Sequence, residues 1–262
     1  MATSSERKPA PEGRRIRLVR LVLPAALLLG ALLRAEYLRE LISTPFWYNL
    51  LLDAEWYDEI ARRFADGRTL DREQLLFRAP LYPLFLSSLY RWFGPNLLAP
   101  RVLQMALGLI LVVVTWRIAF RTHGRRVAAL TAVLAATYGM FIYYEAELLG
   151  ASVTTLLAAL ALLSLLEGDA QDSLRRLFFA GLALGLATAT HALALVMAPV
   201  AALWILRGGR RVLPIAAFLI GLAIPVGGVV ARNYATTGTA VIAAQGGINF
   251  YIGNNARADG RS

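Results

Sequence analysis

The sequence predicts an all-α protein: a polytopic transmembrane helix bundle of about seven spans, with interfacial helices in a large first external loop. Three observations lead to this prediction. Hydrophobic residues make up 58% of the 262 residues, the mean hydropathy is +0.55, and short basic segments separate several long apolar runs. A soluble core of this size has no need of such runs.

The net charge points in the same direction. Formal charge is +10, and Lys8 is the single lysine among 27 basic residues. In a soluble protein this charge would favour nucleic-acid binding. Here the arginines cluster between apolar runs, the positive-inside pattern of membrane proteins, so no nucleic-acid partner is expected.

The chain has no cysteine, which excludes disulfides, a thiolate nucleophile and a cysteine metal site. Its alanine and arginine content is typical of GC-rich bacteria, which favours the bacterial inner (plasma) membrane.

The amino-terminal third divides into a tail, a span and a long loop. Residues 1–15 are polar, basic and broken by proline and glycine, which predicts a disordered cytoplasmic tail. Residues 16–33 are the first span; a signal peptide is the alternative, but charged residues follow where a cleavage site would be needed. Residues 34–95 are then external. Their periodicity predicts surface-lying helices, and residues 80–93 are too short to span and are interrupted by proline.

The remaining apolar runs alternate in direction, and basic segments fall on the cytoplasmic side. Residues 177–206 are long for one helix and short for two, and the small polar centre at residues 188–191 together with parity favours two. Residues 16–233 are thus predicted to form one transmembrane module, followed by an external Gly- and Asn-rich loop at residues 234–262. The other predicted spans are residues 97–120, 127–144, 148–166 and 212–230.

The most acidic segment begins at Asp53, in the external loop. If this segment is helical, Asp53, Tyr57, Ile60 and Phe64 share a narrow arc, so one carboxylate lies on an apolar and aromatic face. Asp53 could carry chemistry there, or it could simply cap an interfacial helix.

Neighbouring charges on the same segment can satisfy each other. Asp58 and Arg62, like Glu59 and Arg63, have the acid-before-base spacing of helical ion pairs. Asp53 and Glu55 are left without such a local partner.

An ordered set of short motifs carries a family resemblance. In chain order, they are Asp53, Tyr57 and Ala61; Arg78-Ala79-Pro80-Leu81-Tyr82-Pro83; Arg101, Gln104 and Gly108; Arg232-Asn233-Tyr234; and the run from Gly246 to Asn255. This set resembles the polytopic GT-C glycosyltransferases, most of all the bacterial branch similar to protein O-mannosyltransferases and aminoarabinose transferases (families 39 and 83). Members of this class usually carry further spans and an external domain. The chain ends at Ser262 within a loop, so it is expected to be an amino-terminal portion.

The resemblance implies that a sugar moves from a polyprenyl-phosphate donor to a protein, lipid or glycan acceptor on the external face, with inversion. Such a reaction needs a carboxylate to deprotonate the acceptor. Asp53 is expected to be this base, with Glu55 as the alternative. Glu145 or Glu147 would supply a second acidic group, or they form a solvated helix end.

The departing phosphate needs cations. Arg78 and Arg101 are expected to bind it because they lie on the outer side against the positive-inside trend; the alternative is that they snorkel to lipid headgroups. Tyr57, Tyr82 and His191 are expected to support the site, although His191, often arginine in similar sequences, could be only a hydrogen-bonded structural residue.

Two features of the predicted site stay open. A divalent cation, Mg²⁺ or Mn²⁺, is compatible with the sequence, since oxygen-ligand sites leave little trace. The segment with Gly246, Gly247 and Gly253 is either a mobile loop that closes over the cavity or an ordinary connection.

The alternative function is a non-catalytic membrane protein, either a transporter fragment or a partner that binds polyprenyl lipid. A transporter should place ionisable groups near the bilayer midplane. In this chain the acids gather at the outer ends of the predicted spans, which favours the transferase.

Overall fold

The computed structural model describes residues 12–68, 70–170, 173–207 and 212–255. Their regular structure is entirely helical, which confirms the predicted fold class. The elements are α1 (Glu12–Ile42), η1 (Pro45–Trp47), α2 (Asp53–Ala65), α3 (Arg72–Phe77), α4 (Leu81–Phe93), α5 (Leu98–Thr137), α6 (Gly139–Ala146), α7 (Ala151–Ala170), α8 (Leu174–Thr190), η2 (Ala192–Val196), α9 (Met197–Leu206), α10 (Val212–Thr237) and α11 (Gln245–Asn254).

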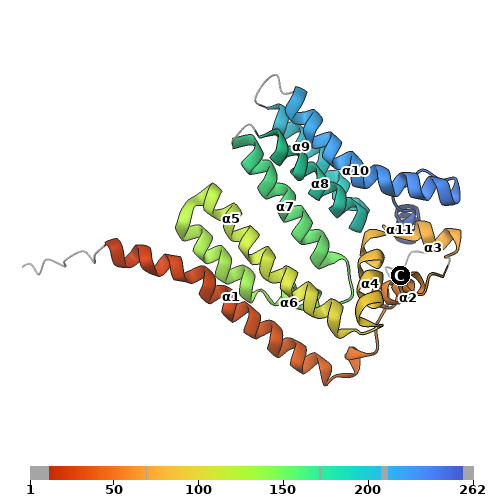
Figure 1. Ribbon diagram of the computed structural model, residues 1–262, viewed down its shortest axis with the longest axis horizontal. Coiled ribbons are helices and arrows are strands. Elements are labelled where there is room, and N and C mark those ends of the chain that lie inside the picture. The colour runs from red at the N-terminus through yellow and green to blue at the C-terminus, as the bar shows by residue number, and fades with distance from the viewer. Residues whose placement is uncertain (1–11, 69, 171–172, 208–211, 256–262) are drawn as a thin grey trace, which may run out of the picture.

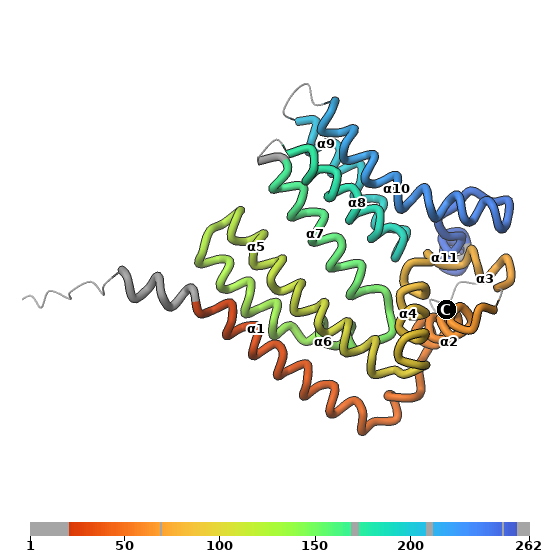
Figure 2. The backbone as a smooth tube through the Cα atoms, in the orientation of Figure 1, coloured from red at the N-terminus to blue at the C-terminus, as the bar shows by residue number. Residues whose placement is uncertain are grey.

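The long helices form a row in which neighbours in sequence are neighbours in space. α1 packs on α5, α5 on α7, α7 on α8, and α8 on α10. Helices α2, α3, α4 and α11 gather on one side of this row, beside the ends of the long helices (Figures 1 and 2). The fold therefore separates a bundle of long helices from a cluster of short helices, and α2, α3 and α4 of this cluster come from the loop predicted at residues 34–95.

Four described helices are long and apolar enough to cross a membrane: Leu21–Ile42, Leu98–Thr137, Ala151–Gly168 and Val212–Thr237. The second of them, in α5, is a hairpin, because Gly124 has φ 80° and ψ −175° and interrupts the helix. Only glycine adopts such values readily. Figure 1 shows the chain folding back between its two arms. The predicted spans at residues 97–120 and 127–144 correspond to these arms, and the total of seven spans stays a prediction.

The break predicted within residues 177–206 is confirmed. Helix α8 ends at Thr190, His191 takes an extended conformation, and η2 and α9 follow.

Three helix boundaries differ from the predictions. Helix α1 continues to Ile42, past the predicted end of the first span at residue 33, because the charge of Arg34 is paired inside the bundle with Glu145. The outward span at residues 127–144 bends at Tyr138, where α6 begins.

The third difference lies after residue 230. Helix α10 runs on to Thr237, and residues 245–254 form α11 where the composition predicts a loop. Hydrogen bonds hold the connection between them: Asn233 Nδ2 donates to the carbonyls of Val241 (2.8 Å) and Ile242 (3.3 Å), and Ala244 N donates to Leu76 O (2.7 Å). Gly246, Gly247 and Gly253 are helical, so this segment is not the irregular loop expected.

Helix α2 is amphipathic, as predicted. Its apolar face buries Ala54, Tyr57, Ile60 and Ala61 and packs on α4. The two expected ion pairs are present on its polar face, with 2.7 Å between Arg62 and Asp58 and 2.5 Å between Arg63 and Glu59.

Candidate active site

Asp53 and Arg78 form the centre of the candidate site. Arg78 Nη1 donates to Asp53 Oδ2 (2.8 Å) and Nη2 to Oδ1 (2.5 Å), a bidentate pair between the start of α2 and the end of α3. The Asp53 side chain is 54% exposed, whereas that of Arg78 is 11% exposed. The sequence predicts both residues in the site but in different roles, and it does not predict that they pair. Leu52, just before Asp53, has φ 51° and ψ −115°, a strained conformation of the kind that gathers at functional sites.

Aromatic rings surround the guanidinium of Arg78. Its Cζ lies 5.3 Å from the ring centroid of Trp56, 5.2 Å from that of Tyr57 and 5.3 Å from that of Phe77. Burial opposes the charge, but hydrogen bonds to Asp53 and Tyr57 outweigh it and raise the pKa of Arg78. Its Nε is buried and has no hydrogen-bond partner within the described residues. Arg78 is therefore a charged group in which one buried N–H donor is unsatisfied.

A chain of contacts links this pair to the bundle. The ring of Tyr57 meets that of Tyr82 edge to face, 4.9 Å between centroids. Tyr82 is fully buried and its hydroxyl donates to Gln104 Oε1 (2.6 Å). Gln104 Nε2 in turn donates to the carbonyls of Glu145 (2.8 Å) and Glu147 (2.7 Å). Burial raises the pKa of the Tyr82 phenol well above its ordinary value, so the hydroxyl keeps its proton as a donor.

Glu145 is buried rather than solvated. Arg34 Nε and Nη2 donate to its two carboxylate oxygens at 2.7 and 2.8 Å, so the solvated-end alternative is wrong for this residue. Gly108 makes room for the carboxylate, since a Cβ there would lie 2.0 Å from Glu145 Oε1. Glu147 is half-buried just after α6. Burial raises the pKa of Glu147, and the nearby Arg101 opposes this shift.

Arg101 is 1% exposed, which rules out the snorkelling alternative. Its Nε donates to Ala146 O (2.8 Å) and its Nη1 to Trp47 O (3.1 Å), and its Cζ lies 4.2 Å from the Trp47 ring centroid. Arg101 thus ties η1 to the end of α6.

The other two expected residues lie at the surface. His191 is exposed at the junction of α8 and η2. Glu55 is exposed on α2 and forms no ion pair with any residue that the structure describes.

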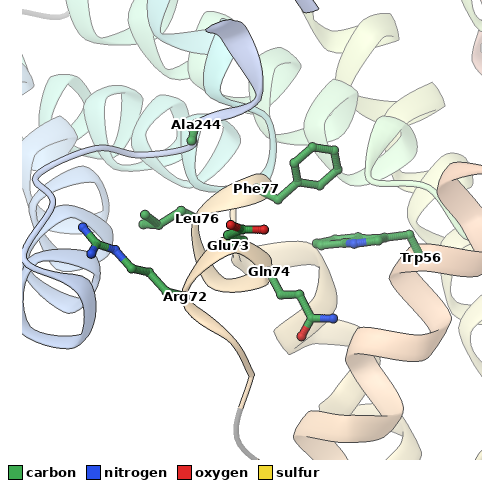
Figure 3. A pocket seen from close by; sticks show the side chains of 7 residues that line it. All are labelled: Trp56, Arg72, Glu73, Gln74, Leu76, Phe77 and Ala244. Carbon is green, nitrogen blue, oxygen red and sulfur yellow. The ribbon is translucent and has the colours of Figure 1, made fainter. Parts of the chain in front are cut away.

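Three hollows that share lining residues lie around α3 and the start of α4, and Arg78 lines the smallest of them. The first is a cleft of about 770 Å³ beside α3 (Figure 3), here called the α3 cleft. It is lined by Trp56, Arg72, Glu73, Gln74, Leu76, Phe77 and Ala244. The second is a small cavity of about 10 Å³, onto which Trp56, Arg78 and Arg232 all face.

The third hollow, of about 250 Å³, is here called the α10 groove. It is lined by Pro80, Leu81, Leu84, Leu186, Ala189, Ile224, Pro225, Gly228, Val229 and Arg232. Trp56 borders both the α3 cleft and the small cavity, while Arg232 borders both the small cavity and the α10 groove. An almost wholly apolar groove and a polar and aromatic cleft therefore share lining residues with the small cavity onto which Arg78 faces.

Sequence reasoning did not single out Trp56, Arg72, Glu73 or Gln74. Trp56 follows Asp53 at i,i+3 spacing, and residues with this spacing are neighbours on a helix. The spacing alone could therefore have predicted that Trp56 lies beside Asp53. Nothing in the sequence pointed to the α3 residues, which reach the site through the tertiary fold.

The described residues contain no ligand cluster that supports the expected Mg²⁺ or Mn²⁺ site. Among the residues that the structure describes, no group of three or more His, Asp or Glu side chains could hold a metal ion.

A family model described as dolichyl-phosphate-mannose-protein mannosyltransferase matches residues 78–230. The match begins at Arg78 and includes Tyr82, Gln104, Glu145 and Glu147. No curated protein and no solved structure has significant similarity to the chain.

Proposed function

The chain belongs to the dolichyl-phosphate-mannose-protein mannosyltransferase family, and from this premise we propose that it transfers a sugar from a polyprenyl-phosphate donor to an acceptor. Glycosyltransferase chemistry follows from the family. The donor, the external face, inversion of the anomeric carbon and the bacterial inner membrane belong to the proposal.

The observation that carries the proposal is the order of the three hollows. An isoprenoid chain needs an apolar groove, and its phosphate needs cations at the end of that groove. The α10 groove is lined by aliphatic residues and by Arg232, which faces the same small cavity as Arg78. A carrier lying in the α10 groove would thus present its phosphate to these two arginines and its sugar toward Asp53.

In the proposed reaction, the acceptor oxygen attacks the anomeric carbon while its proton passes to the Asp53 carboxylate. The bond between the anomeric carbon and the phosphate oxygen breaks, and the electron pair stays on the polyprenyl phosphate. One carboxylate opposite the leaving group gives a single displacement with inversion.

Arg78 connects donor binding to the base. In the structure its two Nη groups donate to both oxygens of Asp53, so the carboxylate is already engaged and is not free to meet an acceptor hydroxyl. A donor phosphate competes with Asp53 for the guanidinium. Donor binding therefore frees the carboxylate at the moment when a base is needed.

The test is carrier binding by the full chain in lipid nanodiscs. Radiolabelled polyprenyl phosphate should bind saturably, and excess unlabelled polyprenyl phosphate should displace it, whereas polyprenol of the same length should not. Equal competition by polyprenol would contradict a phosphate site and overturn the proposal.

A further inference from the structure

The α3 cleft has the composition of a carbohydrate site. Figure 3 shows the rings of Trp56 and Phe77 on one side of the view and Arg72 on the other, with the Glu73 carboxylate between them. Arg78 lies over the Trp56 ring but does not line the cleft. Sugar rings present flat C–H faces that pack on aromatic rings and hydroxyls that need planar polar partners, and the cleft offers both.

The polar groups of the cleft retain bonding capacity. Glu73 is exposed and forms no ion pair within the described part of the chain. Arg72 donates from Nη2 to Thr239 Oγ1 (3.0 Å), which leaves other guanidinium N–H groups available. Gln74 accepts through Oε1 from Arg63 Nη1 (3.3 Å), and its amide N–H₂ group can still donate.

The described backbone around the cleft is helical or connecting chain and offers no strand edge. Residues 72–77 are helical, and the connection between α10 and α11 donates from Ala244 N to Leu76 O (2.7 Å). A peptide ligand in extended conformation is held mainly by main-chain hydrogen bonds. Because no strand edge borders the cleft in the described part of the chain, its polar side chains suit hydroxyl groups better than an extended peptide.

The position of the cleft connects it to the reaction. Asp53 and Trp56 are separated by three residues on α2, so their Cβ atoms are neighbours, roughly 5–6 Å apart. A sugar packed on Trp56 would bring a hydroxyl close to the carboxylate of Asp53.

From these observations, we infer that the α3 cleft binds the acceptor and that this acceptor is a saccharide. A pyranose ring packs on Trp56, and Glu73 accepts hydrogen bonds from adjacent hydroxyls. That the bound saccharide is an acceptor rests on the proposed function. Saccharide binding itself depends only on the cleft.

The experiment measures ligand binding without a donor. The full chain in nanodiscs is titrated with methyl mannoside, methyl glucoside, a mannotriose and a Ser/Thr-rich peptide, and binding is followed by saturation-transfer NMR. At least one saccharide should bind saturably, with the strongest transfer to the C–H groups of one ring face. Trp56→Leu should weaken that binding about tenfold, on the scale of an aromatic contact plus lost burial.

Matched variants separate the cleft from the rest of the surface. Trp92 is 84% exposed on α4, so Trp92→Leu should leave saccharide binding unchanged. Glu73→Gln changes an exposed residue that folding does not need, and it should weaken binding several-fold, whereas Glu40→Gln on α1 should not.

The outcomes are distinguishable from those of the carrier test. Absence of saturable saccharide binding, or binding indifferent to Trp56 and Glu73, overturns the saccharide inference even if the carrier binds. Trp56-dependent binding of the peptide alone overturns it in favour of a protein acceptor. Saccharide binding together with failed carrier binding leaves the cleft intact and removes the proposed function.

Discussion

Both carboxylate oxygens of Asp53 accept hydrogen bonds from one guanidinium, that of Arg78. Three aromatic rings lie within 5.3 Å of Arg78 Cζ and restrict where this group can move. Its Nε is buried and lacks a partner among the described residues, so a ligand oxygen would meet Arg78 through the Nη groups that hold Asp53. This geometry makes Arg78 the residue through which donor and base can influence each other.

Replacing Arg78 with Gln should weaken polyprenyl-phosphate binding by roughly 1.5–3 kcal/mol, the scale of a hydrogen bond to a charged group. The carrier-displacement assay measures this change. Arg62→Gln is the matched control, since Arg62 is also paired with an aspartate, Asp58, and lies over a ring, that of Tyr90. Arg62 does not border any of the three hollows, so its variant should bind the carrier normally. Unchanged affinity in Arg78→Gln would contradict the phosphate role.

Removing the Tyr82 hydroxyl should destabilise the protein by about 1–3 kcal/mol, because the Gln104 side-chain carbonyl oxygen would be left buried without this donor. Thermal unfolding of Tyr82→Phe in detergent measures the effect. Tyr48 is 78% exposed, so Tyr48→Phe should unfold at the wild-type temperature. Equal midpoints for Tyr82→Phe and wild type would show that the link to Gln104 contributes nothing.

At the residue level, the sequence predicts short-range pairs and misses long-range ones. Asp58–Arg62 and Glu59–Arg63 follow from helical spacing alone, and both are present. Asp53–Arg78 joins residues 25 apart and Arg34–Glu145 joins residues 111 apart. Such pairs depend on how helices pack, which hydropathy and periodicity do not encode.

Among the helix contacts, α8 and α10 approach each other closely through glycine. A Cβ on Gly181 would lie 1.9 Å from the carbonyl oxygen of Phe218, and one on Gly221 would lie 2.1 Å from that of Phe178. Each glycine thus faces the backbone of the other helix. In membranes such small residues allow close packing that van der Waals contact then stabilises.

Gly181→Ala should force α8 and α10 apart and destabilise the bundle by about 1–3 kcal/mol, the usual effect of overpacking. Gly227→Ala, also on a bundle helix, is the control, since no atom lies within 4 Å of the position that its methyl group would take. It should be neutral or stabilising because alanine favours helices. Unfolding in denaturant compares them, and equal stability of the two variants would contradict the close contact.

At the level of elements, hydropathy predicts which runs are helical but not where each helix stops. The break at His191 was predictable from the small polar residues before it. The extension of α1 to Ile42 was not, because a charged residue ends an apolar run in sequence yet can be paired inside a bundle, as Arg34 is. Helix α11 was not predicted because its glycine content favours a loop. A hydrogen bond from Ala244 N to Leu76 O holds the segment that leads into it.

Over the whole molecule, charge separates the two ends of the bundle. The Asp53–Arg78 pair lies among the short helices at one end, while Gly124 marks the turn of the α5 hairpin within a basic segment. From the positive-inside rule we expect that turn to lie in the cytoplasm and the short helices to lie outside.

Reporter fusions at Gly67 and Gly124 should therefore lie on opposite sides of the membrane, Gly67 outside and Gly124 inside. Both glycines have positive φ and no atom within 4 Å of where a Cβ would lie, so an insertion there should disturb little packing. Gly209, in another basic segment, lies outside the described residues and should report the cytoplasmic side. Activity on the same side at Gly67 and Gly124 would contradict the external site.

Asp53 is, in the proposed reaction, the base for transfer from a polyprenyl-phosphate sugar. The most direct measurement is transfer of labelled mannose from polyprenyl-phosphate mannose by the full chain and by Asp53→Asn, in the same proteoliposomes. The variant should lose at least about 100-fold in rate, the lower range for a general base, yet bind the carrier at least as well as wild type. Asp66→Asn, at the other end of α2, should transfer normally. Near-normal transfer by Asp53→Asn would contradict the role of Asp53 as the base.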